Sequence, residues 1–202
     1  MEKIGYYFIT DEKLSLKGNF YDVKQAVSQG VRFIQYRAKN KTTEELFKEA
    51  FALRKLCKKV IFIVNDRIDI ALAVSASGVH LGKDDLPPDV ARKILGKDKI
   101  IGVSVGSLKE AVLAKKEGAD YLGVGPIFAT KTKLDAGRPL GVELITKIKK
   151  NLRIPVVAIG GINLVNAKVV VNSQADGLCA ISEVVSSSII RERIKEFQSL
   201  FK

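Results

Sequence analysis

The feature that most constrains the fold is a repeated unit of short apolar run, turn and amphipathic stretch, which recurs about eight times along the chain. The apolar runs show almost no polar alternation, which is typical of parallel strands in a sheet that is covered on both faces. The amphipathic stretches supply the helical crossovers that parallel strands need. We therefore predict strands at residues 6–9, 33–36, 60–64, 78–81, 100–103, 121–124, 156–159 and 177–180.

Eight such units in 202 residues favour one domain, a (β/α)8 barrel of the TIM type that spans residues 1–202. An open doubly wound sheet could be built from the same elements, and periodicity alone leaves that alternative open. The barrel is favoured because polar residues repeatedly follow the apolar runs, where barrel enzymes form their active sites. Helix starts are expected at Thr42 or Thr43 and at Ser107, and a helix end at Gly118.

The chain is basic, with 34 Lys and Arg against 22 Asp and Glu and a net charge of +12. These basic residues are interleaved with apolar residues at helical spacing, so most of them are expected on solvated outer faces. No aromatic and basic stacking strip or recognised nucleic-acid motif accompanies them, and we expect no nucleic-acid partner. A basic surface does attract small phosphorylated substrates.

The sequence also indicates where the protein works. The longest stretch without a charge, residues 154–167, is too short to cross a bilayer, and no membrane partner is expected. The N-terminus lacks the features of a secretory signal, which predicts a cytoplasmic protein. Cys57 and Cys179 have no metal-ligand spacing and are interpreted as buried, reduced thiols.

Basic and amide side chains follow the second apolar run. Strand alternation points Gln35, Arg37 and Lys39 to the same side. One amide and two cations would then face the barrel mouth as an anion site. The alternative, a strand that simply leads into a basic loop, is equally compatible with this segment alone.

Carboxylates follow the third and fourth runs, as Asn65-Asp66 and Asp84-Asp85. Hard oxygen ligands of this kind suit Mg²⁺, which binds through one or two carboxylates while phosphate oxygens and waters complete its shell. Taken separately, either carboxylate is better explained as a helix cap. Their joint position opposite a basic strand end favours a site for metal and diphosphate.

Loops five to eight carry further candidates. Ser104 follows the fifth run, and the long connection 125–137 contains the Thr130-Lys131-Thr132-Lys133 segment, which could hold phosphate and close over the site. A solvated surface loop is the alternative. Gly160-Gly161 and Ile181-Ser182 follow the last two runs, where many barrels bind phosphate.

Three residues with ring side chains, His80, Tyr36 and Phe128, are interpreted as structural. His80 is the only histidine and lies inside an apolar run with no nucleophile beside it in sequence, so we predict a structural role. Tyr36 and Phe128 could stack on a heterocycle, but packing in the core or at the rim is their more ordinary role.

Taken together, these motifs resemble the thiamine phosphate synthase family over essentially the full chain. The matching segments are Gln35-Tyr36-Arg37-Ala38-Lys39, Asn65-Asp66, Asp85, Ser104, residues 125–133, Gly161 and Ile181-Ser182. The resemblance implies binding of a pyrimidine diphosphate by Gln35, Tyr36, Arg37, Ala38, Lys39, Asn65, Ser104 and Lys133. It implies binding of a thiazole phosphate by Thr130, Lys131, Thr132, Gly161, Ile181 and Ser182. It further implies Mg²⁺ on Asp66 and Asp85, and catalytic roles for Ser104, Lys133 and Arg37.

The implied reaction joins 4-amino-2-methyl-5-hydroxymethylpyrimidine diphosphate to thiazole phosphate, or to its carboxylate, by a dissociative substitution that releases diphosphate. The related thiazole tautomerase is one alternative, which Gly106 weakens because a histidine is expected there; many synthases also have that histidine. A barrel that binds phosphate ligands without turnover is another. The sequence leaves the oligomeric state open, a homo-oligomer included.

Overall fold

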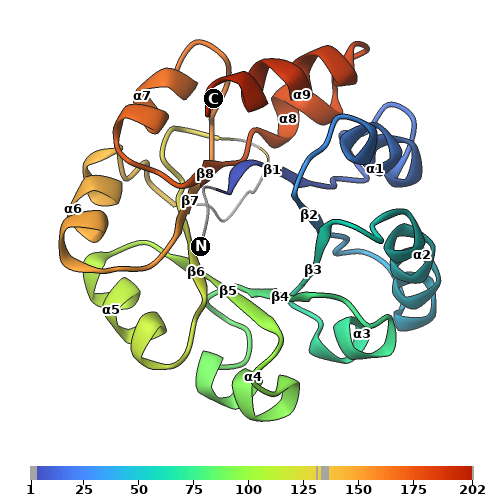
Figure 1. The fold of residues 1–202 in the computed structure, drawn as a ribbon, viewed down its shortest axis with the longest axis horizontal. Coiled ribbons are helices and arrows are strands. Elements are labelled where there is room, and N and C mark those ends of the chain that lie inside the picture. The colour runs from blue at the N-terminus through green and yellow to red at the C-terminus, as the bar shows by residue number, and fades with distance from the viewer. Residues whose placement is uncertain (1–3, 131, 133–136, 202) are drawn as a thin grey trace.

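The protein is a closed barrel of parallel strands. The structure is a computed structural model that describes residues 4–130, 132 and 137–201, and in it β1 to β8 pair in sequence order until β8 returns to β1 (Figure 1). This confirms the predicted (β/α)8 fold and excludes the open sheet. The strands are Gly5–Ile9 (β1), Phe33–Tyr36 (β2), Ile61–Asn65 (β3), Gly78–Leu81 (β4), Ile100–Val105 (β5), Tyr121–Val124 (β6), Val156–Ala158 (β7) and Gly177–Leu178 (β8). Their ends differ from the predicted ones by at most two residues. The apolar run outlasts the ladder in β7 and β8, whereas the ladder outlasts the predicted run in β3 and β5.

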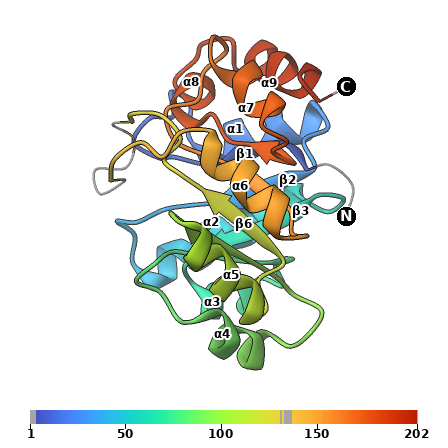
Figure 2. The same cartoon turned by 90° about the vertical axis from the view of Figure 1, so that its left-hand side faces the viewer.

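The helices form a ring outside the strands, and Figure 2 shows α5 and α6 lying across β6. In the described part of the chain they are Asn19–Ser28 (α1), Thr43–Leu56 (α2), Ile68–Ala73 (α3), Pro88–Leu95 (α4), Leu108–Lys116 (α5), Glu143–Asn151 (α6), Ala167–Asn172 (α7), Ile181–Val185 (α8) and Ile190–Ser199 (α9). None of these described helices is long and apolar enough to cross a membrane.

The predicted helix starts are found in the structure. Thr42 caps α2 in a capping box with Glu45, and the Ser107 side chain accepts from the Glu110 N–H at the start of α5. Gly118 follows α5 with φ +96°, a conformation that side chains disfavour. Local signals alone therefore set these helix boundaries.

Alternation along the strands divides the core into two layers. Tyr6 points outward, where its ring stacks on Phe197 of α9 at 5.4 Å between centroids. Tyr7, its neighbour, points into the barrel. The inner layer is a separate cluster of buried side chains, namely Ile4, Tyr7, Ile9, Phe33, Tyr121, Val157 and Cys179. Both cysteines are free and buried, as expected.

Glycines make room for the largest inner side chains. Gly102 lies in register between His80 on β4 and Tyr121 on β6. A Cβ on Gly102 would lie 2.1 Å from Cζ of Tyr121, and one on Gly123 would lie 2.9 Å from Cε1 of His80. The inner rings therefore occupy space that only glycine leaves on the adjacent strands.

We expect Gly102→Ala to destabilise the protein by about 3 kcal/mol, the upper end for overpacking a core, because the Tyr121 ring lies between strands and cannot swing away. Gly106→Ala is the matched control, since its nearest contact would be an ordinary 3.5 Å to Glu110 and its effect should stay within about 0.5 kcal/mol. Urea unfolding measures both. Equal free energies of unfolding for the two variants would contradict this packing.

Candidate active site

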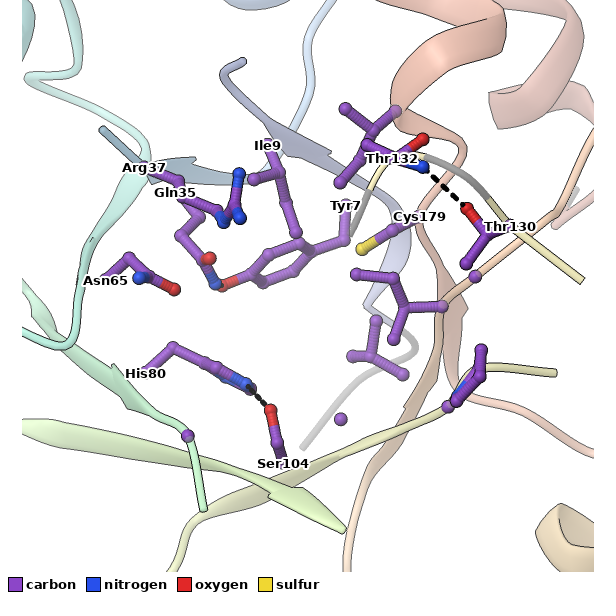
Figure 3. Close-up of a pocket in the computed structure, with 18 of the residues that line it drawn as sticks. Tyr7, Ile9, Gln35, Arg37, Asn65, His80, Ser104, Thr130, Thr132 and Cys179 are labelled. Atoms are coloured by element: carbon purple, nitrogen blue, oxygen red, sulfur yellow. Dashed lines mark hydrogen bonds between the residues drawn. The ribbon is translucent and has the colours of Figure 1, made fainter. Parts of the chain in front are cut away.

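A cavity of about 240 Å³ opens at the carboxyl ends of the strands, and every strand or the loop after it contributes to its wall (Figure 3). Most of the predicted site residues line it: Gln35, Arg37, Lys39, Asn65, Asp66, Asp85, Ser104, Thr130, Thr132, Gly161, Ile181 and Ser182. Lys131 and Lys133 lie outside the described residues. The fold thus gathers residues from seven separate loops, while their ligand roles stay predictions.

Tyr36 and Ala38 are not among the residues that line the cavity. The Tyr36 hydroxyl instead donates to Oε2 of Glu49 on α2 at 2.6 Å, on the outer side of the barrel. The alternation that points Arg37 inward necessarily points its two neighbours outward. The inclusion of these side chains in the pyrimidine diphosphate site is therefore corrected, and core packing is the role that the structure gives Tyr36.

The Arg37 side chain is held by the end of β1. Its Nη1 lies 3.2 Å from Oδ2 of Asp11, a carboxylate that is 6% exposed. Its backbone N–H donates to Oγ1 of Thr10 at 2.9 Å. Asp11 was not singled out from the sequence, because its partner lies 26 residues away. A guanidinium fixed in this way is oriented before any anion arrives.

Two carboxylates face the basic strand end. Asp66 has φ +61°, a left-handed conformation, and its N–H donates to the carbonyl of His80 on the next strand. Burial, followed by a hydrogen bond and charge repulsion from Asp85, raises the pKa of Asp66 to about 6, while Lys39 and Arg37 act in the opposite direction. The two acidic groups therefore converge on one point near the two cations.

Neither carboxylate caps a helix. The residue before α3 is Arg67 and the residue before α4 is Pro87, and at neither helix start does a backbone N–H donate to a capping side chain. Asp85 instead accepts from the Gly82 N–H within its own turn at 2.6 Å. The capping alternative is thus wrong for both positions.

This pair fits Mg²⁺ bound together with a phosphorylated ligand. Within the described ranges no group of three or more His, Cys, Asp or Glu side chains could hold a metal by itself. Mg²⁺ commonly takes one or two carboxylates and completes its shell with phosphate oxygens and waters. A cation there would also relieve the repulsion that raises the pKa of Asp66.

The predicted structural role of His80 stays a prediction, but the structure places this side chain at the cavity, which its sequence position did not indicate. Its Nε2 lies 3.0 Å from Oγ of Ser104 (Figure 3). Its Nδ1 lies 2.9 Å from the Tyr121 hydroxyl. Tyr121 and Tyr7 also line the cavity. All three are inside apolar runs, so their sequence neighbours gave no signal of a polar site.

The sixth loop is anchored at both ends. The N–H of Phe128 donates to the carbonyl of Gly160 at 3.0 Å, and the N–H of Leu140 donates to the carbonyl of Pro126 at 2.8 Å. Between these anchors, the Thr132 N–H donates to Oγ1 of Thr130 at 3.2 Å (Figure 3). The two threonines are thereby held at the cavity.

Close packing of loops six and seven requires glycine. Gly161 has φ +64°, and a Cβ there would lie 2.4 Å from the carbonyl oxygen of Ala129. Gly161 and Thr130 therefore share one side of the cavity with Ile181 and Ser182, which begin α8. Hydroxyls and backbone N–H groups at this side suit a phosphate.

Gly106 does not line the cavity. Its N–H donates to Oε2 of Glu110 at 2.6 Å, where α5 begins. Ser104, two residues earlier, does line the cavity, and its Oγ lies 3.0 Å from Nε2 of His80.

In the metal-free protein, the raised pKa of Asp66 means that the folded state loses stability as the pH rises through about 6. We expect Asp85→Asn to remove the like charge and to stabilise the protein at pH 8 by about 1 kcal/mol, a figure reduced for solvent screening. This gain should disappear at pH ~4, where Asp66 is protonated in both proteins. Urea unfolding in the presence of a chelator measures it, with Asp84→Asn as control; a gain that is the same at both pH values would refute the coupling.

Comparison with known proteins agrees with this geometry. The sequence profile of the family described as "Thiamine monophosphate synthase" matches residues 6–184. The chain is 50% identical to a thiamine-phosphate synthase of Methanosarcina barkeri, with 100% of this chain and 92% of the relative covered. It is 49% identical to one of Methanospirillum hungatei, with 97% of each covered.

Solved structures are similar as well. A thiamine phosphate pyrophosphorylase from Pyrococcus furiosus superposes with a TM-score of 0.91 at 43% identity, covering 98% of this chain and 96% of that one. A 3-hexulose-6-phosphate synthase superposes with a TM-score of 0.69 at 15% identity, which shows the shared barrel alone.

Proposed function

This chain belongs to the thiamine monophosphate synthase family, and we propose that it joins 4-amino-2-methyl-5-hydroxymethylpyrimidine diphosphate to thiazole phosphate, or to its carboxylate. The observation that carries this proposal is the meeting, at one cavity mouth, of two cationic side chains with two converging carboxylates. A diphosphate that brings Mg²⁺ satisfies both sets of charges at once.

The proposed step is a substitution at the exocyclic methylene carbon of the pyrimidine. The bond from this carbon to the diphosphate oxygen breaks and its electron pair leaves with the diphosphate. The lone pair of the thiazole nitrogen then forms the new carbon–nitrogen bond. The electron-rich aminopyrimidine stabilises positive charge on the carbon between these events, so the protein needs no nucleophile of its own.

Stabilisation of the leaving group is then the main task of the protein. Arg37 is oriented by Asp11 and, with Lys39, reaches the cavity where the diphosphate would lie. Asn65 lines the same side and can donate through its amide. The resemblance adds Lys133, which lies outside the described residues.

Asp66 and Asp85 would hold Mg²⁺. When bound, Mg²⁺ neutralises negative charge on the diphosphate oxygens as they depart. The residues themselves prepare this site, because the Asp66 backbone turns its carboxylate toward Asp85 at the expense of repulsion between them.

The remaining walls position the two rings and exclude water. Gln35 and Ser104 provide polar groups for the pyrimidine, and Ile9, Val157 and Ile159 line the cavity with apolar surface. A carbocation in this environment is protected from water. Thr130, Thr132, Gly161, Ile181 and Ser182, with Lys131 by resemblance, would bind the thiazole phosphate.

The proposed substrates are small molecules, and we assign the reaction to the cytoplasm. The two free, buried cysteines are compatible with a reducing compartment. Whether the chain forms a homo-oligomer stays a prediction.

The deciding experiment measures diphosphate release from the pyrimidine diphosphate, thiazole phosphate and Mg²⁺, with each component omitted in turn. We expect release only with all three, and thiamine phosphate as the second product. Asp85→Asn should reduce turnover at least ~100-fold, as expected when a metal ligand is lost, with Asp98→Asn, an exposed carboxylate that does not line the cavity, as control. Isomerisation of a thiazole carboxylate phosphate without diphosphate release would instead identify a tautomerase.

We expect Arg37→Ala to lower kcat/KM for the pyrimidine diphosphate about 100-fold, because removing one preorganised contact to a developing charge costs about 3 kcal/mol. Arg193→Ala, which removes an exposed arginine of α9 paired with Glu196, is the control and should change kcat/KM less than about twofold.

Arg37→Ala also leaves Asp11 buried without its cation, so the double variant with Asp11→Asn separates stability from catalysis. Its thermal stability should recover while its activity stays low. Recovery of both would show that Arg37 acts only through folding.

A further inference from the structure

Five polar side chains form one line of hydrogen bonds from one side of the cavity floor to the other. Nε2 of Gln35 lies 3.0 Å from the Tyr7 hydroxyl, which lies 2.8 Å from the Tyr121 hydroxyl. The Tyr121 hydroxyl lies 2.9 Å from Nδ1 of His80, and Nε2 of His80 lies 3.0 Å from Oγ of Ser104. We refer to these five residues as the floor chain; Figure 3 shows four of them, converging from β1, β2, β4 and β5.

The floor chain has a direction. Each tyrosine hydroxyl carries one hydrogen, and a neutral imidazole donates through one nitrogen and accepts through the other. With the Gln35 amide nitrogen donating to Tyr7, the arrangement in which each hydroxyl hydrogen passes to the next member of the line sends the Tyr7 hydrogen to Tyr121 and the Tyr121 hydrogen to Nδ1 of His80.

This direction fixes which hydrogen-bonding group each end of the floor chain, Ser104 and Gln35, offers to the cavity. With Nδ1 of His80 accepting, the imidazole hydrogen is on Nε2 and is donated to Oγ of Ser104. The hydroxyl hydrogen of Ser104 is then available to a ligand. At the other end, the Gln35 amide nitrogen faces Tyr7, which leaves its oxygen as an acceptor.

We propose that Tyr121 is a positioning residue, which fixes the cavity floor as an acceptor at Gln35 and a donor at Ser104 by holding His80 in the Nε2–H tautomer. This inference rests on the proposed function, which supplies its ligand, the pyrimidine diphosphate. An aminopyrimidine presents an N–H donor beside an unprotonated ring nitrogen, which is the complementary pattern.

Burial makes it costly for any of the innermost members of the floor chain to lack a hydrogen-bond partner. Tyr7 and Tyr121 are each 1% exposed and Gln35 is 2% exposed, so bulk water does not compete with these hydrogen bonds. Burial also raises the pKa of both tyrosines, which therefore remain hydroxyl donors. Gly102 and Gly123 leave the space in which Tyr121 and His80 lie.

The opposite arrangement also pairs every member of the floor chain. If the Gln35 amide were turned over, each hydrogen would move to the opposite partner and His80 would carry its hydrogen on Nδ1. Ser104 would then donate to His80 and offer the ligand an acceptor. The two arrangements thus differ in which ring nitrogen of His80 carries the hydrogen, and this difference can be observed.

His80 is the only histidine in the chain, so one pair of imidazole signals reports the direction. We would record long-range ¹H–¹⁵N spectra of the ¹⁵N-labelled, untagged protein at pH 8 without substrates. A pyrrole-like Nε2 and a pyridine-like Nδ1 are expected. The Nδ1–H tautomer, or a doubly protonated ring, would overturn the proposal. This measurement is independent of turnover, so it separates failure of this inference from failure of the proposed function.

Tyr121→Phe tests the positioning role, and Tyr6→Phe is a matched control, because the Tyr6 hydroxyl is buried outside the barrel and makes a 3.4 Å contact with the carbonyl of Ala180. In Tyr121→Phe the Nδ1 signal should shift, and the KM for the pyrimidine diphosphate should rise about tenfold. The KM for thiazole phosphate should change less than about twofold. Tyr6→Phe should leave the His80 signals and both KM values unchanged. If Tyr121→Phe matches Tyr6→Phe in both readouts, the role assigned to Tyr121 is wrong.

Discussion

Closure of the eight strands is the constraint on which the rest of this structure depends. A closed parallel sheet sends every second side chain into a narrow interior and brings all the carboxyl ends to one mouth. The Tyr121 ring fits inside because the adjacent strand carries glycine at Gly102. The buried polar groups of Tyr7, Tyr121 and Gln35 must bond to neighbouring protein groups, because little water reaches them. The floor chain is the result of both requirements.

The same closure concentrates charge at the mouth. Asp66 and Asp85 repel each other, so the ligand-free site contains an unfavourable interaction, whereas Arg37 is paired with the buried carboxylate of Asp11. The left-handed backbone at Asp66 adds local strain. A bound diphosphate with Mg²⁺ would relieve the charge imbalance, which makes ligand binding and stability interdependent. The proposed catalysis uses these same charges, since the diphosphate that leaves when the bond breaks is a highly charged anion.

Much of this site was predictable because strand alternation and strand order are local properties of a sequence. Gln35, Arg37 and Lys39 were placed inward by alternation alone, and the two acidic loops were placed together by the order of strands. Errors arose where one segment was treated as a unit. Tyr36 and Ala38 share a motif with Arg37 but lie on the opposite face of the strand.

The sequence by itself determined the repeated strand and helix units, several helix caps and the side toward which most site residues point, because these depend on periodicity and on residues close together in the chain. The tertiary structure decided that the strands close into a barrel. Only the tertiary structure decided the surroundings of His80, whose partners Ser104 and Tyr121 are 24 and 41 residues away. It likewise paired Asp11 with Arg37 and rejected Asp66 and Asp85 as helix caps. These outcomes depend on which groups meet across a closed interior, and distances between strands are set by packing and register, which no local pattern contains.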